Sequence, residues 1–280
     1  MPQNNTQIVT LDYNANENQH SFKIILNRDL YSQKTMWDDF ENGFLYEQET
    51  SQVYIDLLQQ GDTFLDIGAH IGYYSLLAAS LVGTSGQVFS FEPNADNLLQ
   101  LKENIMLNQY ASVQIFPFAV GDENKEVNFF ENQDNDGGHA LWDVGKHDFN
   151  IKSRENSQTF TVQMKTLDSL FSESKIDSLK LIKMDVEGCE AMVLEGATQL
   201  LKTHQYPFVI SEINRFALSE MGSSEDEVRN KMNSLGYECY VLTEAGLIKQ
   251  EPGQFIECNY VFNVMFIHPD RLGEISINIA

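Results

Sequence analysis

The sequence predicts an α/β protein with a doubly wound, Rossmann-like sheet of about seven strands, mostly parallel, with an antiparallel hairpin at the C-terminal edge. Three observations lead to this fold class. Short apolar runs alternate with longer segments of helical periodicity from residue 50 onward. Turn residues separate these segments, and acidic or glycine-containing turns follow several of the apolar runs. With 280 residues, of which 42% are hydrophobic and 21% charged, the chain can bury a sizeable core.

The first half of the chain begins with polar residues and then adopts the alternating pattern. Residues 1–48 form an N-terminal extension that we expect to pack on the core, with short strands at 7–10 and 22–26. Residues 50–60 carry apolar residues at helical spacing and stop at Gly61. The alternation that follows gives strands at 63–68, 87–92 and 113–119, and helices at 72–81 and 95–108.

The second half continues the pattern after a polar interruption, so we assign residues 49–280 to one domain. Residues 125–131 alternate like an edge strand, and 132–158 then form a polar, lid-like insertion with Gly137 and Gly138 in its first half. Ser224 is the expected N-cap of a helix over 224–235. The remaining expected elements are helices at 167–171 and 190–202, strands at 160–164, 179–184 and 208–213, and an edge hairpin of 237–242 with 260–267.

Composition excludes several partners. The net charge of −23 repels phosphate backbones and anionic lipid, so neither nucleic acid nor a membrane is expected as a partner. The polar start of the chain does not resemble a signal peptide, and no apolar run approaches the roughly 20 residues of a membrane span. Cys189, Cys239 and Cys258 lack a metal-ligand spacing and fit reduced thiols, which predicts a cytoplasmic location. The oligomeric state stays open.

A glycine turn after the first core strand is the main candidate for a binding site. Asp66, Gly68, His70 and Gly72 lie in the run Asp-Ile-Gly-Ala-His-Ile-Gly. Such glycines let the backbone approach a ligand closely, whereas the preceding carboxylate favours a cation or a hydroxyl over a pyrophosphate. The spacing differs from the G-x-G-x-x-G turn of dinucleotide sites and suits S-adenosylmethionine, which carries an ammonium, a sulfonium and hydroxyls.

A second carboxylate strengthens this interpretation. Glu92 ends the second core strand about twenty residues beyond the glycine turn, where an acidic side chain can bind both hydroxyls of a ribose. Asn94 is a candidate for cofactor contact or for capping the next helix. Ala119, at the end of the third strand, is assigned to the same cofactor site. Together these positions predict an adenosine-containing ligand.

A third acidic segment follows the strand at 179–184. It reads Lys-Met-Asp-Val-Glu-Gly-Cys-Glu from Lys183 to Glu190. Acidic residues at a helix start stabilise the helix dipole, which accounts for Glu190 and part of Glu187. Asp185 stands at the strand end itself, so we expect it to contact the cofactor near the reacting methyl group.

In combination these motifs resemble the FkbM family of methyltransferases. The resemblance rests on the loop from Asp66 to Gly72, on Phe-Glu-Pro at 91–93, on the 183–190 segment and on Leu-Glu-Gly-Ala at 194–197. It implies a class I methyltransferase sheet, S-adenosylmethionine as cofactor, and methylation of a hydroxyl on a sugar or on a polyketide or peptide natural product. The sequence departs from the family at His70, where Asn is usual.

The acceptor side needs a general base, because an aliphatic hydroxyl holds its proton tightly. Asp185, Glu187, Glu212 and His139 are the candidate catalytic residues, and the carboxylates at strand ends are preferred to the histidine of the glycine-containing loop. Tyr46, Glu47, His139 and Asn214 are the candidate substrate-binding residues.

Three alternatives remain open. Asp185, Glu212 and Asn214 could supply the oxygen ligands of a Mg²⁺ ion that assists the reaction, although no tight acidic spacing requires a metal. N-methylation would need less help from a base than O-methylation. The third alternative is a non-catalytic module that binds S-adenosylmethionine or a protein partner.

Overall fold

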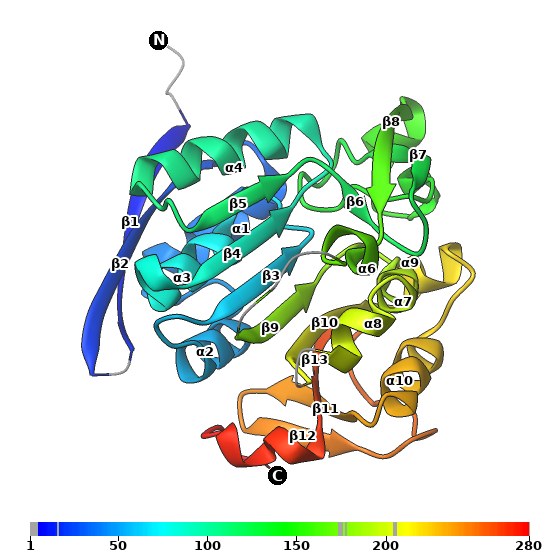
Figure 1. The fold of residues 1–280 in the computed structure, drawn as a ribbon. Coiled ribbons are helices and arrows are strands. Elements are labelled where there is room, and N and C mark those ends of the chain that lie inside the picture. The colour runs from blue at the N-terminus through cyan, green and yellow to red at the C-terminus, as the bar shows by residue number, and fades with distance from the viewer. Residues whose placement is uncertain (1–4, 16, 173–175, 177, 204–205, 280) are drawn as a thin grey trace.

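The computed structural model describes residues 5–15, 17–172, 176, 178–203 and 206–279, and its centre is a twisted sheet with helices on both faces (Figure 1). The eight strands of this sheet lie in the order β12-β11-β13-β10-β9-β3-β4-β5. Their bounds are Thr63–Ile67 (β3), Gln87–Phe91 (β4), Val113–Phe116 (β5), Leu179–Met184 (β9), Phe208–Asn214 (β10), Glu238–Thr243 (β11), Gly246–Gln250 (β12) and Val261–Ile267 (β13).

The predicted doubly wound α/β class is confirmed. Strands β5, β4, β3, β9 and β10 run parallel, and the strand order reverses between β3 and β9. In open sheets of this kind the carboxyl ends of the strands on either side of the reversal form the ligand crevice. The turns after β3 and β9 therefore face the same crevice.

The C-terminal part of the sheet agrees with the prediction in one respect and differs in another. The strands expected over 237–242 and 260–267 pair antiparallel as β11 and β13, but this pair is not the edge of the sheet. β13 is inserted between β10 and β11 and runs antiparallel to both, so it is an interior strand. The edge hairpin is formed by β11 and β12, and the sheet has eight strands where about seven were expected. The missed strand, β12, has only one buried residue, Leu247, and therefore lacks the apolar run by which a strand is usually detected.

Two apolar layers cover the sheet. One contains side chains of α2 (Gln48–Leu57), α3 (Tyr73–Val82) and α4 (Ala95–Asn108). The other contains side chains of the short helices α6 (Leu167–Leu170), α7 (Glu190–Glu195), α8 (Thr198–Thr203) and α9 (Arg215–Glu220), and of α10 (Glu225–Ser234). The expected helix over 190–202 is divided between α7 and α8 at Gly196 and Ala197. A Cβ at position 196 would lie 2.0 Å from the Gly121 carbonyl oxygen, so this turn requires glycine. Ser224 caps α10 as predicted.

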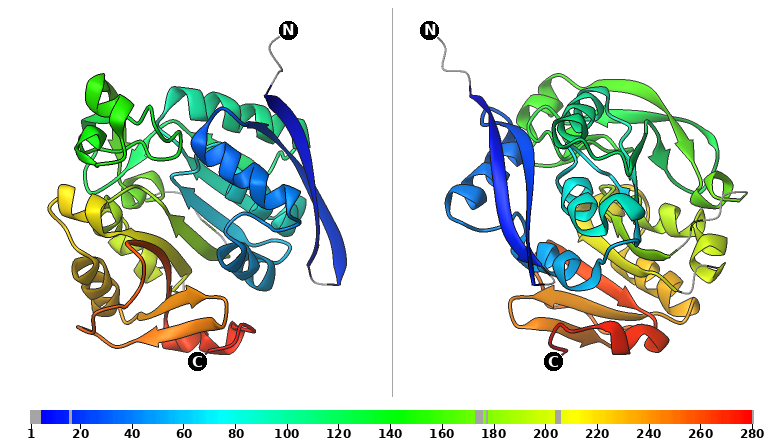
Figure 2. Two further views of the ribbon diagram at one scale, coloured as in Figure 1. Left: turned by 180° about the vertical axis from the view of Figure 1, so that it is seen from behind. Right: turned by 60° about the vertical axis from the view of Figure 1, so that its left-hand side comes forward.

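The N-terminal segment is more regular than the sequence suggested. β1 (Thr6–Ala15) and β2 (Asn18–Asn27) form a long antiparallel hairpin outside the main sheet, and α1 (Tyr31–Glu41) follows (Figure 2). β2 packs against α3, α4 and α1. The alternating inward residues of β2, Phe22, Ile24 and Leu26, are fully buried and join the same layer as α3 and α4. α1 was not predicted, because its apolar residues are too sparse to mark a helical face.

A small second sheet stands beside the main one. It contains β6 (Ala119–Val120), β8 (Gln158–Lys165) and β7 (Lys125–Glu131), in that order. The strand expected over 113–119 is split at Pro117, which has no N–H for a ladder hydrogen bond, into β5 and β6 of different sheets. Between β7 and β8, the segment 132–157 contains one turn of 3₁₀-helix and the short helix α5 (Ile151–Glu155). Among the described residues, no helix combines the length and apolar character needed to cross a membrane.

Candidate functional site

A cavity opens at the carboxyl ends of β3, β4, β9 and β10. It holds about 1110 Å³ of space, its open mouth included. The sheet contributes Gly68, Glu92, Asp185 and Glu212 to its wall. α1, the segment before α2, and the 132–141 part of the insertion complete the wall with Ser32, Met36, Tyr46, Glu47, Asn135, Gly137, His139 and Leu141. The cavity therefore combines strand ends with segments distant in the sequence.

The glycine turn is shaped by close backbone contacts. Gly68 has a φ of +85°, and a Cβ at this position would lie 1.8 Å from the Asp185 carbonyl oxygen. The Gly68 and Ala69 amides donate to the Phe91 carbonyl at 3.0 and 2.9 Å, which ties the turn to the end of β4. Any larger residue at 68 would push apart the ends of β3 and β9.

Asp66 lies beneath this turn. It is 1% exposed and does not line the cavity, unlike Gly68 and His70. Its Oδ2 accepts a hydrogen bond from Ser75 Oγ at 2.6 Å, and Oδ1 has no partner within the described part of the chain. Burial raises the pKa of Asp66 to about 6, although the nearby Lys183 ammonium opposes this change. Gly72 likewise lies outside the cavity wall and precedes the first turn of α3.

Glu92 lies in the cavity wall, held by two backbone amides. Oε2 accepts from the His70 amide and Oε1 from the Asn94 amide, both at 2.8 Å. Burial raises the pKa of Glu92 to about 7, with these two hydrogen bonds limiting the rise. The Asn94 side chain caps α4 by accepting from the amides of Asp96 and Asn97 and does not line the cavity, whereas Ala119 does.

An ion pair occupies the centre of the site. Lys183 Nζ lies 2.7 Å from Asp185 Oδ2 and 4.7 Å from the centre of the Tyr74 ring. Lys183 is 2% exposed. Burial lowers its pKa, but the carboxylates of Asp185, Glu47 and Asp66 outweigh burial and raise the pKa above its usual value. No role was predicted for Lys183 or Tyr74, because their positions beside the acids depend on how α3 packs on the sheet.

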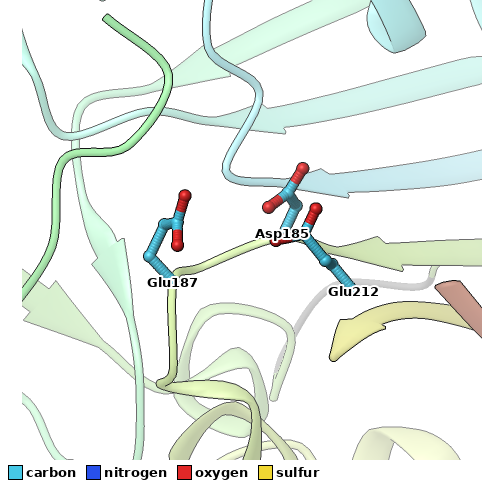
Figure 3. A group of neighbouring side chains, drawn as sticks. All are labelled: Asp185, Glu187 and Glu212. Carbon is cyan, nitrogen blue, oxygen red and sulfur yellow. The ribbon is translucent and has the colours of Figure 1, made fainter. Parts of the chain in front are cut away.

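Three carboxyl groups converge beside this pair. Asp185, Glu187 and Glu212 each offer an oxygen within 4.8 Å of the others (Figure 3). Burial and the Asp185 charge raise the pKa of both Glu187 and Glu212. Glu187 accepts from Asn214 Nδ2 at 3.1 Å, whereas no residue within the described ranges donates to the Glu212 carboxylate. Glu187 and Glu212 therefore release their protons at higher pH than isolated carboxyl groups do.

The predicted substrate-binding residues occupy different environments. Glu47 accepts from Tyr74 OH at 2.8 Å and from Asn263 Nδ2 at 3.1 Å, which ties the start of α2 to β13. Tyr46 lines the cavity beside Glu47, and burial together with the nearby acids raises its pKa. Asn214 lies outside the cavity wall, because its Oδ1 caps α9 through the Ala217 amide and its Nδ2 binds Glu187.

His139 lines the cavity with a defined protonation state. Its Nδ1 accepts from the Asn132 amide at 2.9 Å, so the ring proton is on Nε2. Burial lowers the pKa of His139 to about 4, which keeps the ring neutral at pH 7. In this arrangement His139 can donate to a ligand but is poorly suited to accept the proton of a hydroxyl.

The structure thus brings most of the predicted site residues to one cavity. Those in its wall are Gly68, His70, Glu92, Ala119, Tyr46, Glu47, His139, Asp185, Glu187 and Glu212. Asp66, Gly72, Asn94 and Asn214 support the wall from behind. Besides Lys183 and Tyr74, sequence reasoning missed Asp136, whose carboxylate lies 3.0 Å from the His70 ring. Only the family departure at His70 pointed toward this contact.

The cavity wall fits an adenosine cofactor with a cationic sulfur. Glu92 presents a carboxylate at the position expected for a ribose, fixed by amides that leave further lone pairs for hydroxyl donors. Gly68 lines the wall next to Asp185, whose carbonyl oxygen lies where a Cβ of residue 68 would be. The carboxyl groups of Glu47, Glu92, Asp185, Glu187 and Glu212 line the same cavity as the Lys183 ammonium, and this excess of acidic groups favours a sulfonium.

Comparisons with known proteins agree with this fit. The family model described as the methyltransferase FkbM domain matches residues 66–239. The chain is 28% identical over 170 residues to the hexuronic acid methyltransferase AglP of Haloferax volcanii, covering 60% of this chain and 62% of AglP. It is 27% identical over 158 residues to the 2-O-methyltransferase NoeI of Sinorhizobium fredii, covering 52% of this chain and 62% of NoeI. The matched region thus spans about three fifths of the length of these relatives.

Among solved structures, the methyltransferase FkbM of Methylobacillus flagellatus matches with 14% identity and a TM-score of 0.45, covering 77% of this chain and 50% of that protein. The family match covers more than half of the sequence and includes the glycine turn, Glu92 and the acidic segment after β9. It confirms S-adenosylmethionine as the cofactor. The chain therefore belongs to the FkbM methyltransferase family.

Proposed function

We propose that this protein is an S-adenosylmethionine-dependent methyltransferase that methylates a hydroxyl group on a sugar or on a polyketide or peptide natural product. One observation carries the proposal. One cavity contains two kinds of acidic site. The first is the Glu92 carboxylate, which is held by backbone amides, and the second is the cluster of Asp185, Glu187 and Glu212. The first suits a ribose, and the second suits removal of a hydroxyl proton.

The strand-end residues next to the glycine turn would hold the cofactor. Glu92 would accept from the ribose hydroxyls, Gly68 would let backbone approach the amino-acid portion, and Asp185 would favour the positive charge near the sulfur. When bound, S-adenosylmethionine supplies a methyl group on a sulfonium, which needs no acid to leave. The chain's own contribution is then alignment of the acceptor and removal of its proton.

Glu212 is the best placed general base. Asp185 is engaged by Lys183 at 2.7 Å and Glu187 by Asn214 at 3.1 Å, whereas the described residues leave the Glu212 carboxylate without a donor. Its raised pKa makes the ionised form a stronger base than an ordinary carboxylate. The acceptor O–H proton would move to a Glu212 carboxylate oxygen, with Glu47 and Tyr46 orienting the acceptor and His139 donating a hydrogen bond.

AglP, which is named for hexuronic acid, supports a sugar acceptor, and NoeI, which is named as a 2-O-methyltransferase, supports transfer to oxygen. The raised pKa of Glu212 also favours oxygen over nitrogen, because a neutral amine needs little help from a base. A small-molecule acceptor, with neither nucleic acid nor a membrane as partner, is part of the proposal. The cytoplasmic location expected from the cysteines stays a prediction.

The test uses purified protein, S-adenosylmethionine and a panel of uronic acids, neutral glycosides, amino sugars and hydroxylated polyketides. We expect S-adenosylhomocysteine to form together with an O-methylated product identified by mass spectrometry. Glu92→Ala should weaken S-adenosylhomocysteine binding at least tenfold in calorimetry, whereas Asp185→Asn should lower turnover more than affinity. Methylation only at nitrogen would contradict the acceptor class. Tighter binding of NADH than of S-adenosylmethionine would overturn the proposal.

A further inference from the structure

His70, the residue at which this chain departs from its family, connects the cofactor turn to the insertion. His70 has a φ of +51°, and its amide donates to Glu92 Oε2 at 2.8 Å. Its ring Nε2 lies 3.0 Å from Asp136 Oδ2, and both side chains are at most 14% exposed. His70 thus contacts both Glu92, the carboxylate proposed to bind the ribose, and Asp136, which is more than sixty positions away in the sequence.

Asp136 is the meeting point of four segments. Its Oδ1 accepts from the Ser32 amide at 2.7 Å, and its Oδ2 accepts from Gln33 Nε2 at 3.2 Å in addition to contacting His70. Its backbone carbonyl accepts from Asn97 Nδ2 of α4 at 3.0 Å. The insertion, α1, the cofactor turn and α4 are therefore joined through a single residue.

The bond to Ser32 has a local cause. α1 begins at Tyr31, and its N-cap residue, Leu30, offers no side-chain acceptor. The free amides at this helix start attract an acceptor from elsewhere, and Asp136 supplies it with a negative charge that suits the helix dipole. Burial acts to raise the pKa of Asp136, but the His70 contact and the Ser32 amide outweigh burial and lower it. The carboxylate is therefore ionised at neutral pH.

Asp134, a second aspartate of the insertion, forms hydrogen bonds within the insertion, whereas Asp136 bonds to other segments. Asp134 accepts from the amides of Lys152 and Ser153 at 3.1 and 2.9 Å, and from Ser153 Oγ at 2.9 Å. These bonds close the insertion on itself. The Asp136 side chain makes no such internal bond within the described part of the insertion, and its partners Ser32, Gln33 and His70 lie in other segments. Internal stability of the insertion thus depends on Asp134.

We propose that Asp136 is a positioning residue for cofactor binding: it fixes His70, and through the His70 amide the Glu92 carboxylate, while holding the insertion and α1 over that end of the cavity. The inference rests on the proposed function for the ribose role of Glu92. Ser32, Asn135 and Gly137, all next to these contacts, line the cavity.

The test measures S-adenosylhomocysteine binding by the full chain, so no acceptor is needed. Asp136→Ala should weaken affinity at least tenfold, mainly through faster dissociation in stopped-flow displacement, because ordering of the turn and its cover is lost. His70→Ala keeps the Asp136 cap on α1 and should reproduce most of this loss. In the double variant the losses should not add, since both changes break one contact. Asp136→Glu should recover part of the affinity.

Asp134→Asn is the matched control, because it changes an aspartate of the same insertion that does not touch the cofactor turn. It should lower the thermal midpoint as much as Asp136→Ala does, yet leave affinity within about twofold. Folded Asp136→Ala with wild-type affinity and dissociation rate would overturn the inference, as would full additivity with His70→Ala. Failure of the wild-type protein to bind S-adenosylhomocysteine would instead refute the proposed function.

Discussion

The two ends of the cavity are built in different ways. The end proposed to bind the cofactor, called the cofactor end below, consists of the turn after β3 and the end of β4, which are neighbouring parallel strands. The amides of Gly68, Ala69 and His70 join these two turns. The end proposed to bind the acceptor, called the acceptor end below, contains Glu47 from before α2, Glu187 from the turn after β9, Glu212 from β10 and Asn263 from β13. The cofactor end is fixed by backbone hydrogen bonds, whereas the acceptor end is a balance of side-chain charges.

This difference predicts where a conservative substitution has its largest effect. Glu212→Gln keeps the shape of the acceptor end but removes the proposed base, so turnover should fall by about 10²- to 10⁴-fold. Affinity for S-adenosylhomocysteine should stay within about twofold, because the cofactor end is held independently. Glu49→Gln, an exposed change on α2, is the control and should alter neither quantity. An equal loss in affinity and turnover would show that the two ends act as one unit.

The same division separates what sequence could predict from what it could not. Gly68, Glu92 and Asp185 are recognisable because each follows a strand directly, and the register of parallel strands brings strand ends together. The Lys183–Tyr74 contact and the Glu47–Asn263 bond depend on packing between elements distant in the chain, for which no spacing rule exists. Asp136 belongs to no recognisable motif. Its contact with the start of α1, a helix without a side-chain cap of its own, is seen only in the folded structure.

Element prediction failed for related reasons. The mostly apolar segment 113–119 hides a change of sheet at Pro117, and β12 is too polar to be detected as a strand. The antiparallel pairing of β11 with β13 was predicted correctly, but its place at the sheet edge was wrong, because the interior position of β13 is set by its pairing with β10, a long-range contact. By contrast, the helix over 95–108 and the strand over 179–184 match their predicted limits, since caps and apolar periodicity mark them locally.

At the cofactor end a smaller effect should appear in stability rather than turnover. The pKa of Glu92 is about 7 in the folded protein, above its ordinary value of 4.5, so the native state binds the extra proton between these pH values. The contribution of Glu92 to the free energy of unfolding of the ligand-free protein should therefore be greatest below about pH 4.5. This contribution should be lost as the pH rises through 7. Asp66 adds a similar fall between 3.8 and about 6.

Glu92→Gln should flatten this dependence by up to about 2 kcal/mol between pH 5 and pH 8. The free energy of unfolding would be measured by urea denaturation at several pH values without ligand. The single oxygen of the glutamine amide can accept from only one of the two backbone amides, so the variant also loses stability at every pH. The informative quantity is therefore the slope of the unfolding free energy against pH. Equal slopes in both proteins would contradict the assignment of the raised pKa to Glu92.

The smallest effect is expected for metal removal. Asp185, Glu187 and Glu212 have the oxygen spacing of a divalent cation site, but Lys183 already places an ammonium 2.7 Å from Asp185, and Asn214 uses its oxygen to cap α9. An added cation would face repulsion from this buried ammonium. Dialysis against EDTA should therefore change turnover by less than twofold, and added Mg²⁺ should not raise it. Loss of activity with EDTA and its return with Mg²⁺ would mean that the metal displaces Lys183 from Asp185, and the acceptor end would then be a metal-assisted site.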